Sequence, residues 1–223
     1  MRILYLLFTF FFFMNAAFSQ PGREEIIQYK IKSVTKTYLM GKPAQKIEEK
    51  NYYTRKGDDS LEYYCGKISF TFKSFTDSKG TITKLEKYDA ENAMDEVHLY
   101  KYNKDGSYSI EIAGHSAGTI LQSEYDRNNK CLREIYSGTD TLQFSYNDKG
   151  KLDKIFYYTK GEEPEQIGSI IYGSKGLAER AESLPEEKAR YFKYNNKGLV
   201  SEMKTVTKGK TDNTFFYSYE FWE

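Results

Sequence analysis

The stretch FSYNDKGKLDKIFYY, residues 144–158, decides the fold, because its residue pattern is that of one β-hairpin. Phe144 and Tyr146 lie two residues apart and so share one face of a strand, and residues 152–158 form the return strand. The letters NDKG between the two strands have the composition of a turn. Gly150 matters most, because a short hairpin loop usually ends with a residue at positive φ, which glycine adopts freely.

Versions of this hairpin recur along most of the chain. Seven copies place an aromatic residue shortly before a glycine or, in one copy, before an asparagine, the next residue most tolerant of positive φ. The positions are Tyr53 and Gly57, Phe75 and Gly80, Tyr102 and Gly106, Tyr125 and Asn129, Tyr146 and Gly150, Tyr172 and Gly176, and Tyr194 and Gly198. Successive aromatic residues are 21 to 27 residues apart. That spacing suits two strands of about eight residues joined by two short turns.

Most copies also carry an apolar pair three residues apart on the return strand. The pairs are Ile82 and Leu85, Leu132 and Ile135, Leu152 and Ile155, and Val200 and Met203, with Ala178 and Ala181 as a smaller version. Residues three apart in a regular strand point to opposite faces, so either a bulge lies between them or both faces are partly covered. We favour the bulge, which would bend each return strand and curl the sheet in one direction.

These observations predict an all-β fold, an antiparallel meander of about seven repeated hairpins that forms a curved open sheet or half-barrel. We expect a first strand at residues 26–38, a second at residues 47–53 and a last strand with alternating aromatic residues at 215–221. Two short helices are expected, at residues 90–95 and 186–191. In a meander, all repeated turns fall on one edge of the sheet and the variable connections fall on the other.

The pattern Tyr-[Asn/Asp]-x-x-Gly-x-Leu, at intervals of about twenty residues between positions 53 and 217, resembles the YD repeats of bacterial Rhs-type proteins. Known proteins of this kind wrap a spiral sheet around a toxin domain. Seven copies are too few to enclose such a cargo. The resemblance therefore implies a β-hairpin array in an exported bacterial protein, and we carry over only the hairpin.

The beginning of the sequence predicts export. Arg2 precedes a Phe-rich apolar run, and Ala17-Phe18-Ser19 places small residues at the two positions that a signal peptidase reads. We expect cleavage before Gln20, which leaves residues 20–223 as a single β-hairpin repeat domain in the periplasm or at the cell surface. The apolar run is shorter than a membrane-spanning helix of about 20 residues, so the mature form is not expected to span a membrane by a helix.

Charge and composition restrict the partners. The sequence holds 33 basic and 32 acidic residues, and the first nineteen residues contribute one basic and no acidic residue, so the remainder is formally neutral. A nucleic-acid binder would carry a basic excess on one face, and nucleic acid is excluded as the main partner. The 21 tyrosines could stack on sugar rings, but an aromatic ladder is also an ordinary way to stabilise an antiparallel sheet. A glycan or an envelope protein remains a candidate partner.

No pattern in the sequence indicates a catalytic or metal site. Residues 114–118 match G-x-S-x-G, but strand-like segments flank them and no histidine follows His115, unlike the strand and helix around a hydrolase nucleophile. The only histidines, His98 and His115, have no ligand spacing to either cysteine, so we expect no metal and no cofactor.

Cys65 and Cys131 are expected to remain free thiols. Each is placed on the return strand of a different hairpin, three repeats apart. In a meander that separates them by about 29 Å along the sheet at about 4.8 Å per strand, whereas a disulfide tolerates about 7 Å between Cα atoms.

The sequence therefore favours an exported, non-enzymatic β-repeat protein that is a binding or structural module at the bacterial envelope. Two alternatives stay open. One is a barrel that spans the outer membrane, which needs an apolar lipid-facing side chain at every second residue. The other is a glycan-acting hydrolase, which needs two carboxyl groups about 5 to 9 Å apart in a cleft.

Overall fold

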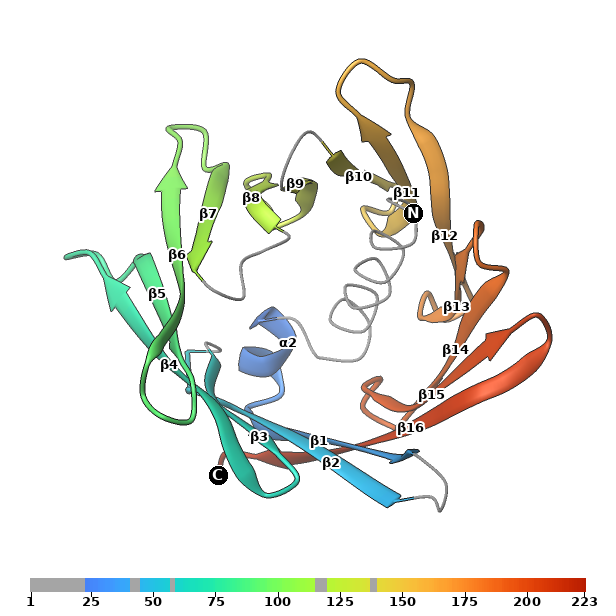
Figure 1. Ribbon diagram of the computed structural model, residues 1–223, viewed down its shortest axis with the longest axis horizontal. Coiled ribbons are helices and arrows are strands. Elements are labelled where there is room, and N and C mark those ends of the chain that lie inside the picture. Colours follow the sequence, from blue (N-terminus) through green and yellow to red (C-terminus); the bar gives the residue numbers. More distant parts are fainter. Residues whose placement is uncertain (1–22, 41–44, 57–58, 115–119, 137–139) are drawn as a thin grey trace. The chain divides into compact units, whose positions relative to one another are not determined.

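The computed structural model describes residues 23–40, 45–56, 59–114, 120–136 and 140–223, and nearly all of them lie in antiparallel strands (Figure 1). The described residues form one helix, α2 (Arg23–Gln28). The strands are β1 (Ile31–Met40), β2 (Gln45–Tyr53), β3 (Asp59–Tyr64), β4 (Lys67–Thr76), β5 (Ile82–Tyr88), β6 (Met94–Tyr102), β7 (Tyr108–Gly114), β8 (Ile120–Tyr125), β9 (Cys131–Tyr136), β10 (Asp140–Tyr146), β11 (Leu152–Thr159), β12 (Glu165–Tyr172), β13 (Ala178–Ser183), β14 (Lys188–Tyr194), β15 (Val200–Thr207) and β16 (Lys210–Phe221). Among the described helices, none is long and apolar enough to cross a membrane.

The strands pair in chain order, and β1 also pairs with β16. The all-β antiparallel meander is confirmed, but the expectation of an open sheet or half-barrel is wrong, because this strand order is that of a closed barrel. The closing register joins Val34 to Tyr219 and Lys36 to Tyr217. Two strands that would otherwise expose unpaired backbone N–H and C=O groups satisfy each other, which removes the edges that promote aggregation.

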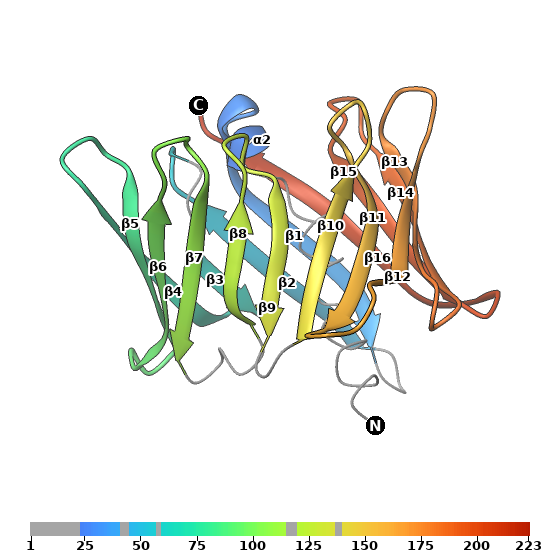
Figure 2. The same ribbon diagram turned by 90° about the horizontal axis from the view of Figure 1, so that it is seen from above.

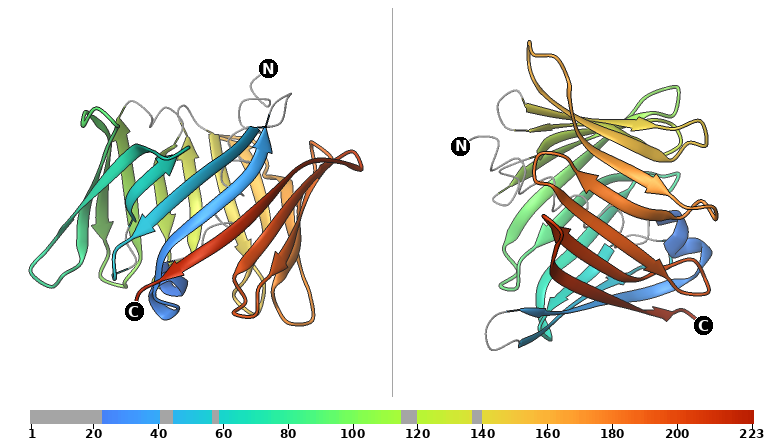
Figure 3. Two further views of the ribbon diagram at one scale, coloured as in Figure 1. Left: turned by 90° about the horizontal axis from the view of Figure 1, so that it is seen from below. Right: turned by 90° about the vertical axis from the view of Figure 1, so that its right-hand side faces the viewer.

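The chain divides into two compact units, one made of Met1–Phe70 and Ile171–Glu223 and the other of Thr71–Ile170. In the first unit, β16, β1 and β2 run side by side, so the two ends of the repeat array are joined there (Figure 3). In the second unit, strands β5 to β11 follow one another in chain order (Figure 2).

Seven described turns share one geometry. In each, the first turn residue donates its N–H to the carbonyl four residues later, and its own carbonyl accepts the N–H of the fourth, positive-φ residue. The first residues are Asp77, Asp89, Asn103, Asp126, Asn147, Gly173 and Asn195. Where that residue is Asp or Asn, its side chain usually also accepts two turn N–H groups, as Asn147 Oδ1 does from Lys149 and Lys151 at 3.0 and 3.1 Å.

Positive φ angles occur at the fourth turn positions, 81° at Gly80, 87° at Gly106, 61° at Asn129, 72° at Gly150, 72° at Gly176 and 80° at Gly198. Gly57 lies outside the described residues. A Cβ at Gly150 would meet Lys130 Nζ at 2.7 Å, but this atom is the end of a flexible side chain that can move away. The positive φ is therefore what favours glycine at this position.

The turn that begins at Asp89 is a copy that the sequence analysis missed. Tyr88 precedes it, and Asn92 takes the positive φ of 63°. The helix expected at residues 90–95 is therefore wrong, because the Asp89 side chain holds the N–H groups of Glu91 and Ala93 in the turn. In the meander this turn lies on the edge opposite the other repeated turns of its unit, so the repeated turns do not all fall on one edge.

Three further expectations about local structure are wrong. Residues 186–191 do not form a helix, since a turn there leads into β14 at Lys188. Residues 26–28 belong to α2 and not to a first strand, which begins at Ile31. Cys65 lies in the tight turn between β3 and β4 with φ of 49°, and not on a return strand.

The predicted bulge is present just beyond the turn in the four hairpins for which a pair of large apolar residues predicted it. The register shifts oppose Thr76, Tyr125, Tyr146 and Tyr194. In the third of these hairpins Leu152 pairs with Tyr146 and Ile155 pairs with Phe144, so the shift brings Leu152 and Ile155 onto the same face. The bulge thus explains how an apolar pair three residues apart contributes to one core.

Tyrosine hydroxyls connect adjacent strands. Each donates to the carbonyl of the residue that opens the preceding strand: Tyr102 to Ile82 at 2.9 Å, Tyr146 to Cys131 at 2.7 Å, Tyr194 to Ala178 at 2.7 Å and Tyr219 to Val200 at 2.6 Å. Tyr102, Tyr146 and Tyr194 are repeat positions, which the sequence identified without assigning them a bond. The repeated tyrosine therefore satisfies a backbone carbonyl beside the bulge.

Candidate functional site

The repeat has a core position eight residues after the first residue of the turn. Leu85, Ile155, Ala181 and Met203 occupy it, and each is at most 8% exposed. In the hairpin that turns at Asp126, the same position holds Glu134, which is 4% exposed. A buried charged residue at a position that four other hairpins fill with a buried apolar side chain breaks the local rule, and such breaks mark candidate functional sites.

Glu134 lies on β9 between Ser123 of β8 and Leu142 of β10, its cross-strand neighbours. The Tyr136 hydroxyl donates a hydrogen bond of 3.0 Å to Glu134 Oε2. Burial raises the pKa of the Glu134 carboxyl from 4.5 to about 7, and the Tyr136 bond opposes this by favouring the carboxylate. The group can therefore gain or lose a proton near neutral pH, which is a property of general acids and of proton-binding sites.

A row of tyrosines adjoins Glu134 on the same face of the second unit. Tyr102 of β6, Tyr108 of β7 and Tyr125 of β8 are cross-strand partners. The Tyr108 and Tyr125 rings stack with centroids 4.7 Å apart at 6°, and the Tyr102 and Tyr108 rings lie 5.3 Å apart. Because these rings use their faces on one another, the row stabilises the sheet as an aromatic ladder. Tyr102, 46% exposed, is the end of the row that solvent reaches most.

Cys131 opens β9 and is paired with Tyr125 across the bulge. Burial raises the pKa of its thiol, and the carboxyl of Glu134 adds to the effect. A thiol that stays protonated is a poor nucleophile, so Cys131 does not have the properties of a catalytic cysteine. Both Cys131 and Cys65 are free, as the sequence analysis expected.

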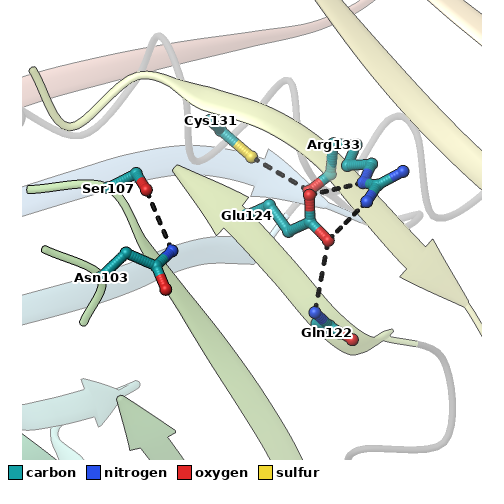
Figure 4. A network of polar contacts seen from close by, with 6 residues as sticks. All are labelled: Asn103, Ser107, Gln122, Glu124, Cys131 and Arg133. Carbon is teal, nitrogen blue, oxygen red and sulfur yellow. Dashed lines mark hydrogen bonds and ion pairs between the residues drawn. The ribbon is translucent and has the colours of Figure 1, made fainter. Parts of the chain in front are cut away.

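The opposite face of β8 and β9 carries a charged network (Figure 4). Arg133 donates two hydrogen bonds to the Glu124 carboxylate, at 2.5 Å from Nε and 2.8 Å from Nη2, and Gln122 Nε2 donates to Glu124 at 3.3 Å. The Cys131 thiol donates to the Arg133 carbonyl at 3.7 Å. Arg133 and Glu124 are partly exposed, so this network is a solvated surface pair and not a buried site.

The first unit holds a second charged residue at a core position. Arg190 lies five residues before the first residue of its turn, where the hairpin that turns at Asn147 has Leu142 and the hairpin that turns at Gly173 has Gly168. Arg190 is 4% exposed and Leu142 is 2% exposed. Burial lowers the pKa of the Arg190 guanidinium to about 10, against the opposing effects of Tyr217 and Glu186. The group therefore keeps its charge at neutral pH although it is buried.

The residues considered for chemistry in the sequence do not converge. His98 lies on β6 with Nε2 3.2 Å from Glu96 Oε2, and His115 is outside the described residues together with most of the G-x-S-x-G segment. The described residues contain no group of three or more His, Cys, Asp or Glu side chains that could hold a metal ion.

Sequence analysis missed Glu134 because of a one-residue register error. It assigned the apolar pair of this hairpin to Leu132 and Ile135, whereas the bulge places Cys131 and Glu134 on the buried face. Leu132 is the extra residue of the bulge and is 42% exposed. Counting from the turn and not from the apolar residues would have placed Glu134 in the core.

No protein-family model and no curated protein matches this sequence. Among solved structures, a porin-like protein from Bacteroides uniformis is 12% identical with a TM-score of 0.43, and the match covers 91% of this chain and 99% of that chain. The Tc holotoxin pore of Photorhabdus luminescens is 9% identical and a TcdB2–TccC3 structure is 10% identical, each with a TM-score of 0.35. Those matches cover 76% and 79% of this chain but 12% and 13% of the other chains.

Proposed function

We propose that this chain is an exported, non-enzymatic protein of YD-repeat type that acts as a binding module at the bacterial envelope. The observation that carries the proposal is the presence of Glu134 and Arg190 at core positions of the repeat. Burying a charge costs several kcal/mol when it is not fully compensated, and an apolar residue would serve packing better. Their presence is explained if they serve binding.

A glycan-acting hydrolase is the less favoured function. Glu134 has the raised pKa of a general acid. Burial and the Tyr136 hydrogen bond shift this pKa, and no second carboxylate contributes to the shift. Glycoside hydrolysis needs a second carboxyl group about 5 to 9 Å away. The cross-strand neighbours of Glu134 are Ser123 and Leu142, neither of which supplies one.

An outer-membrane barrel is the second candidate function, and the pairing of β1 with β16 favours it, because a membrane-spanning sheet must close. It would also need an apolar side chain at every second residue of its lipid-facing surface. In the second unit, Lys101 pairs with Glu111 on one face while Glu134 lies on the other. The charged pair on the exposed face, opposite the buried Glu134, would be costly next to lipid and supports a sheet that lies outside the membrane.

Cell fractionation separates these two functions. The full chain with its own leader would be expressed in a Gram-negative host, and its envelope fraction washed with alkaline carbonate. Release into the supernatant is the expected result, since a peripheral protein is held by polar contacts. Retention in the membrane pellet, with extraction by detergent alone, would favour the membrane-spanning barrel.

Binding is tested by cosedimentation of the purified mature protein with isolated peptidoglycan and with envelope vesicles. We expect Arg190→Met or Glu134→Leu to reduce cosedimentation with at least one of these probes. Lys193→Gln is the matched control, because Lys193 lies three residues from Arg190 on the same strand and its side chain is 70% exposed. Equal sedimentation of all four proteins, or none of any, contradicts the binding function.

A further inference from the structure

The strand that carries Arg190 presents a second cation on the same face. Lys188 lies two residues before Arg190 on β14, so both side chains point to one side of the sheet. The cross-strand neighbours of Lys188 are Ser183 of β13 and Thr207 of β15, and Arg190 faces Thr205 of β15. Lys188 is therefore flanked by hydroxyl groups on both sides, whereas Arg190 has the Thr205 hydroxyl on one side and Ala181 on the other.

This cluster extends from solvent into the core. The Lys188 side chain is 25% exposed, whereas Arg190 is 4%, Thr205 5% and Ser183 2% exposed. Lys188 thus marks the solvent-facing end, and Arg190 and the hydroxyls lie behind it. A small ion that enters beside Lys188 would be desolvated as it reaches Arg190, where charge-assisted hydrogen bonds are strongest.

Two acidic residues lie near the cluster: Glu186 acts on both cations and Asp212 acts on Lys188. Glu186 Oε2 lies 3.8 Å from Lys188 Nζ, beyond hydrogen-bond distance, and Asp212 accepts the hydroxyl of Thr207. Burial lowers the pKa of Lys188, Arg190 lowers it further, and Glu186 and Asp212 oppose the change. The two cations destabilise each other, which an additional negative charge between them would reverse.

The Ser183 side chain gives a separate observation that points to a ligand. Its hydroxyl oxygen is buried and has no hydrogen-bond partner among the described residues. Ser183 is paired with Lys188 across the two strands, so its side chain lies on the cationic face. A buried hydroxyl without a partner costs about 1–3 kcal/mol, and an acceptor brought by a ligand would satisfy it.

We propose that Lys188, Arg190 and Ser183 form a binding site for a phosphate group. A tetrahedral oxyanion can accept the planar guanidinium fork of Arg190, the ammonium of Lys188 and the Ser183 hydroxyl together. The inference deepens the proposed binding function by naming a ligand class. Its failure is distinguishable from failure of that function, because peptidoglycan or vesicle binding that is reduced in Glu134→Leu but survives in Arg190→Met leaves a binding module without a phosphate site.

Isothermal titration calorimetry with inorganic phosphate, at constant ionic strength against chloride, tests the site in the purified mature chain. We expect saturable binding and a rise in the thermal midpoint. Parallel titrations with a sugar phosphate and with phosphatidylglycerol vesicles distinguish a soluble phosphate ester from a lipid headgroup as the source. The phosphate concentration should reach about 10 mM, which is ten times a dissociation constant of about 1 mM. The proposal is wrong if none of the three probes shows saturable binding.

Single-residue variants distinguish phosphate binding at this specific site from nonspecific attraction to surface charge. Arg190→Met should abolish phosphate binding, Arg190→Lys should weaken it at least tenfold because the bidentate fork is lost, and Ser183→Ala should weaken it less. The exposed neighbour variant Lys193→Gln should bind as the parent protein does. If Lys193→Gln loses as much affinity as Arg190→Met, or if Arg190→Met keeps full affinity while remaining folded by circular dichroism, the site is wrong.

Discussion

Glu134 in the second unit and Arg190 in the first are both charged residues buried at core positions of the repeat, but burial affects their charges differently. Both are 4% exposed, at positions where the hairpin that turns at Asn147 has the buried aliphatic residues Ile155 and Leu142. Burial moves the pKa of the carboxyl to about 7, where it can become neutral by binding a proton. The guanidinium has a lowered pKa of about 10 and stays charged across the physiological range. A buried carboxyl can thus avoid the cost of a buried charge by binding a proton. A buried arginine keeps its charge, and only a partner of opposite charge can offset that cost.

The largest expected effect follows from neutralising the acid. Glu134→Gln should raise the free energy of unfolding by about 3 kcal/mol at pH 8 and leave it nearly unchanged below pH 4.5, where the carboxyl is protonated in both states. Between these limits, the parent loses stability as pH rises from 4.5 through 7, because the folded state binds the proton more tightly. Urea denaturation at both pH values measures this. A pH-independent gain would show that charge is not the cause.

Replacing the arginine should have a smaller effect that does not follow this pH dependence. Arg190→Met should stabilise the phosphate-free protein by about 2 kcal/mol, and by similar amounts at pH 5 and pH 8, because an apolar side chain of similar length avoids the burial of charge. Denaturation in phosphate-free buffer checks the value. Destabilisation at both pH values would mean that contacts within the protein already compensate Arg190.

Tyr136→Phe tests how far a hydrogen bond stabilises the buried Glu134 carboxylate. It removes the hydroxyl that donates to Glu134, so it should raise the pKa of that carboxyl above 7 and lower stability by about 1.5 kcal/mol at pH 8. Below pH 5, where the carboxyl is neutral, we expect a smaller loss. Titration of the carboxyl by NMR measures the direction, and an unchanged pKa would remove Tyr136 from the site.

The smallest effect is expected for an exposed pair. Lys101→Gln breaks the ion pair with Glu111, whose side chains are 60% and 44% exposed. Solvent screening should limit the loss to about 0.5 kcal/mol, decreasing further at high salt. Chemical denaturation at low and high ionic strength tests this. A loss as large as that from a buried group would show that exposure does not separate the two classes of charge.

Local chemistry alone predicted much of the fold. The aromatic residue, the Asn or Asp and the glycine of the repeat fixed the turn at Asn147, and the apolar spacing from Leu152 to Ile155 predicted the bulge. The interpretation of Leu132 and Ile135 failed because the bulge inserts one residue, and a shift of one residue exchanges the two faces of a strand. This error placed Glu134 on the exposed face, so the sequence did not identify it as a candidate site residue.

The sequence by itself determined the all-β class and the repeated turns, because these depend on contacts within a hairpin or between neighbouring strands. Only the tertiary structure decided that β1 pairs with β16, since the two strands are separated by the whole array and either could have remained an edge. It also decided which side of each strand is buried. A glutamate or an arginine looks like any other surface charge until cross-strand packing removes it from water, and only then do Glu134 and Arg190 become distinctive.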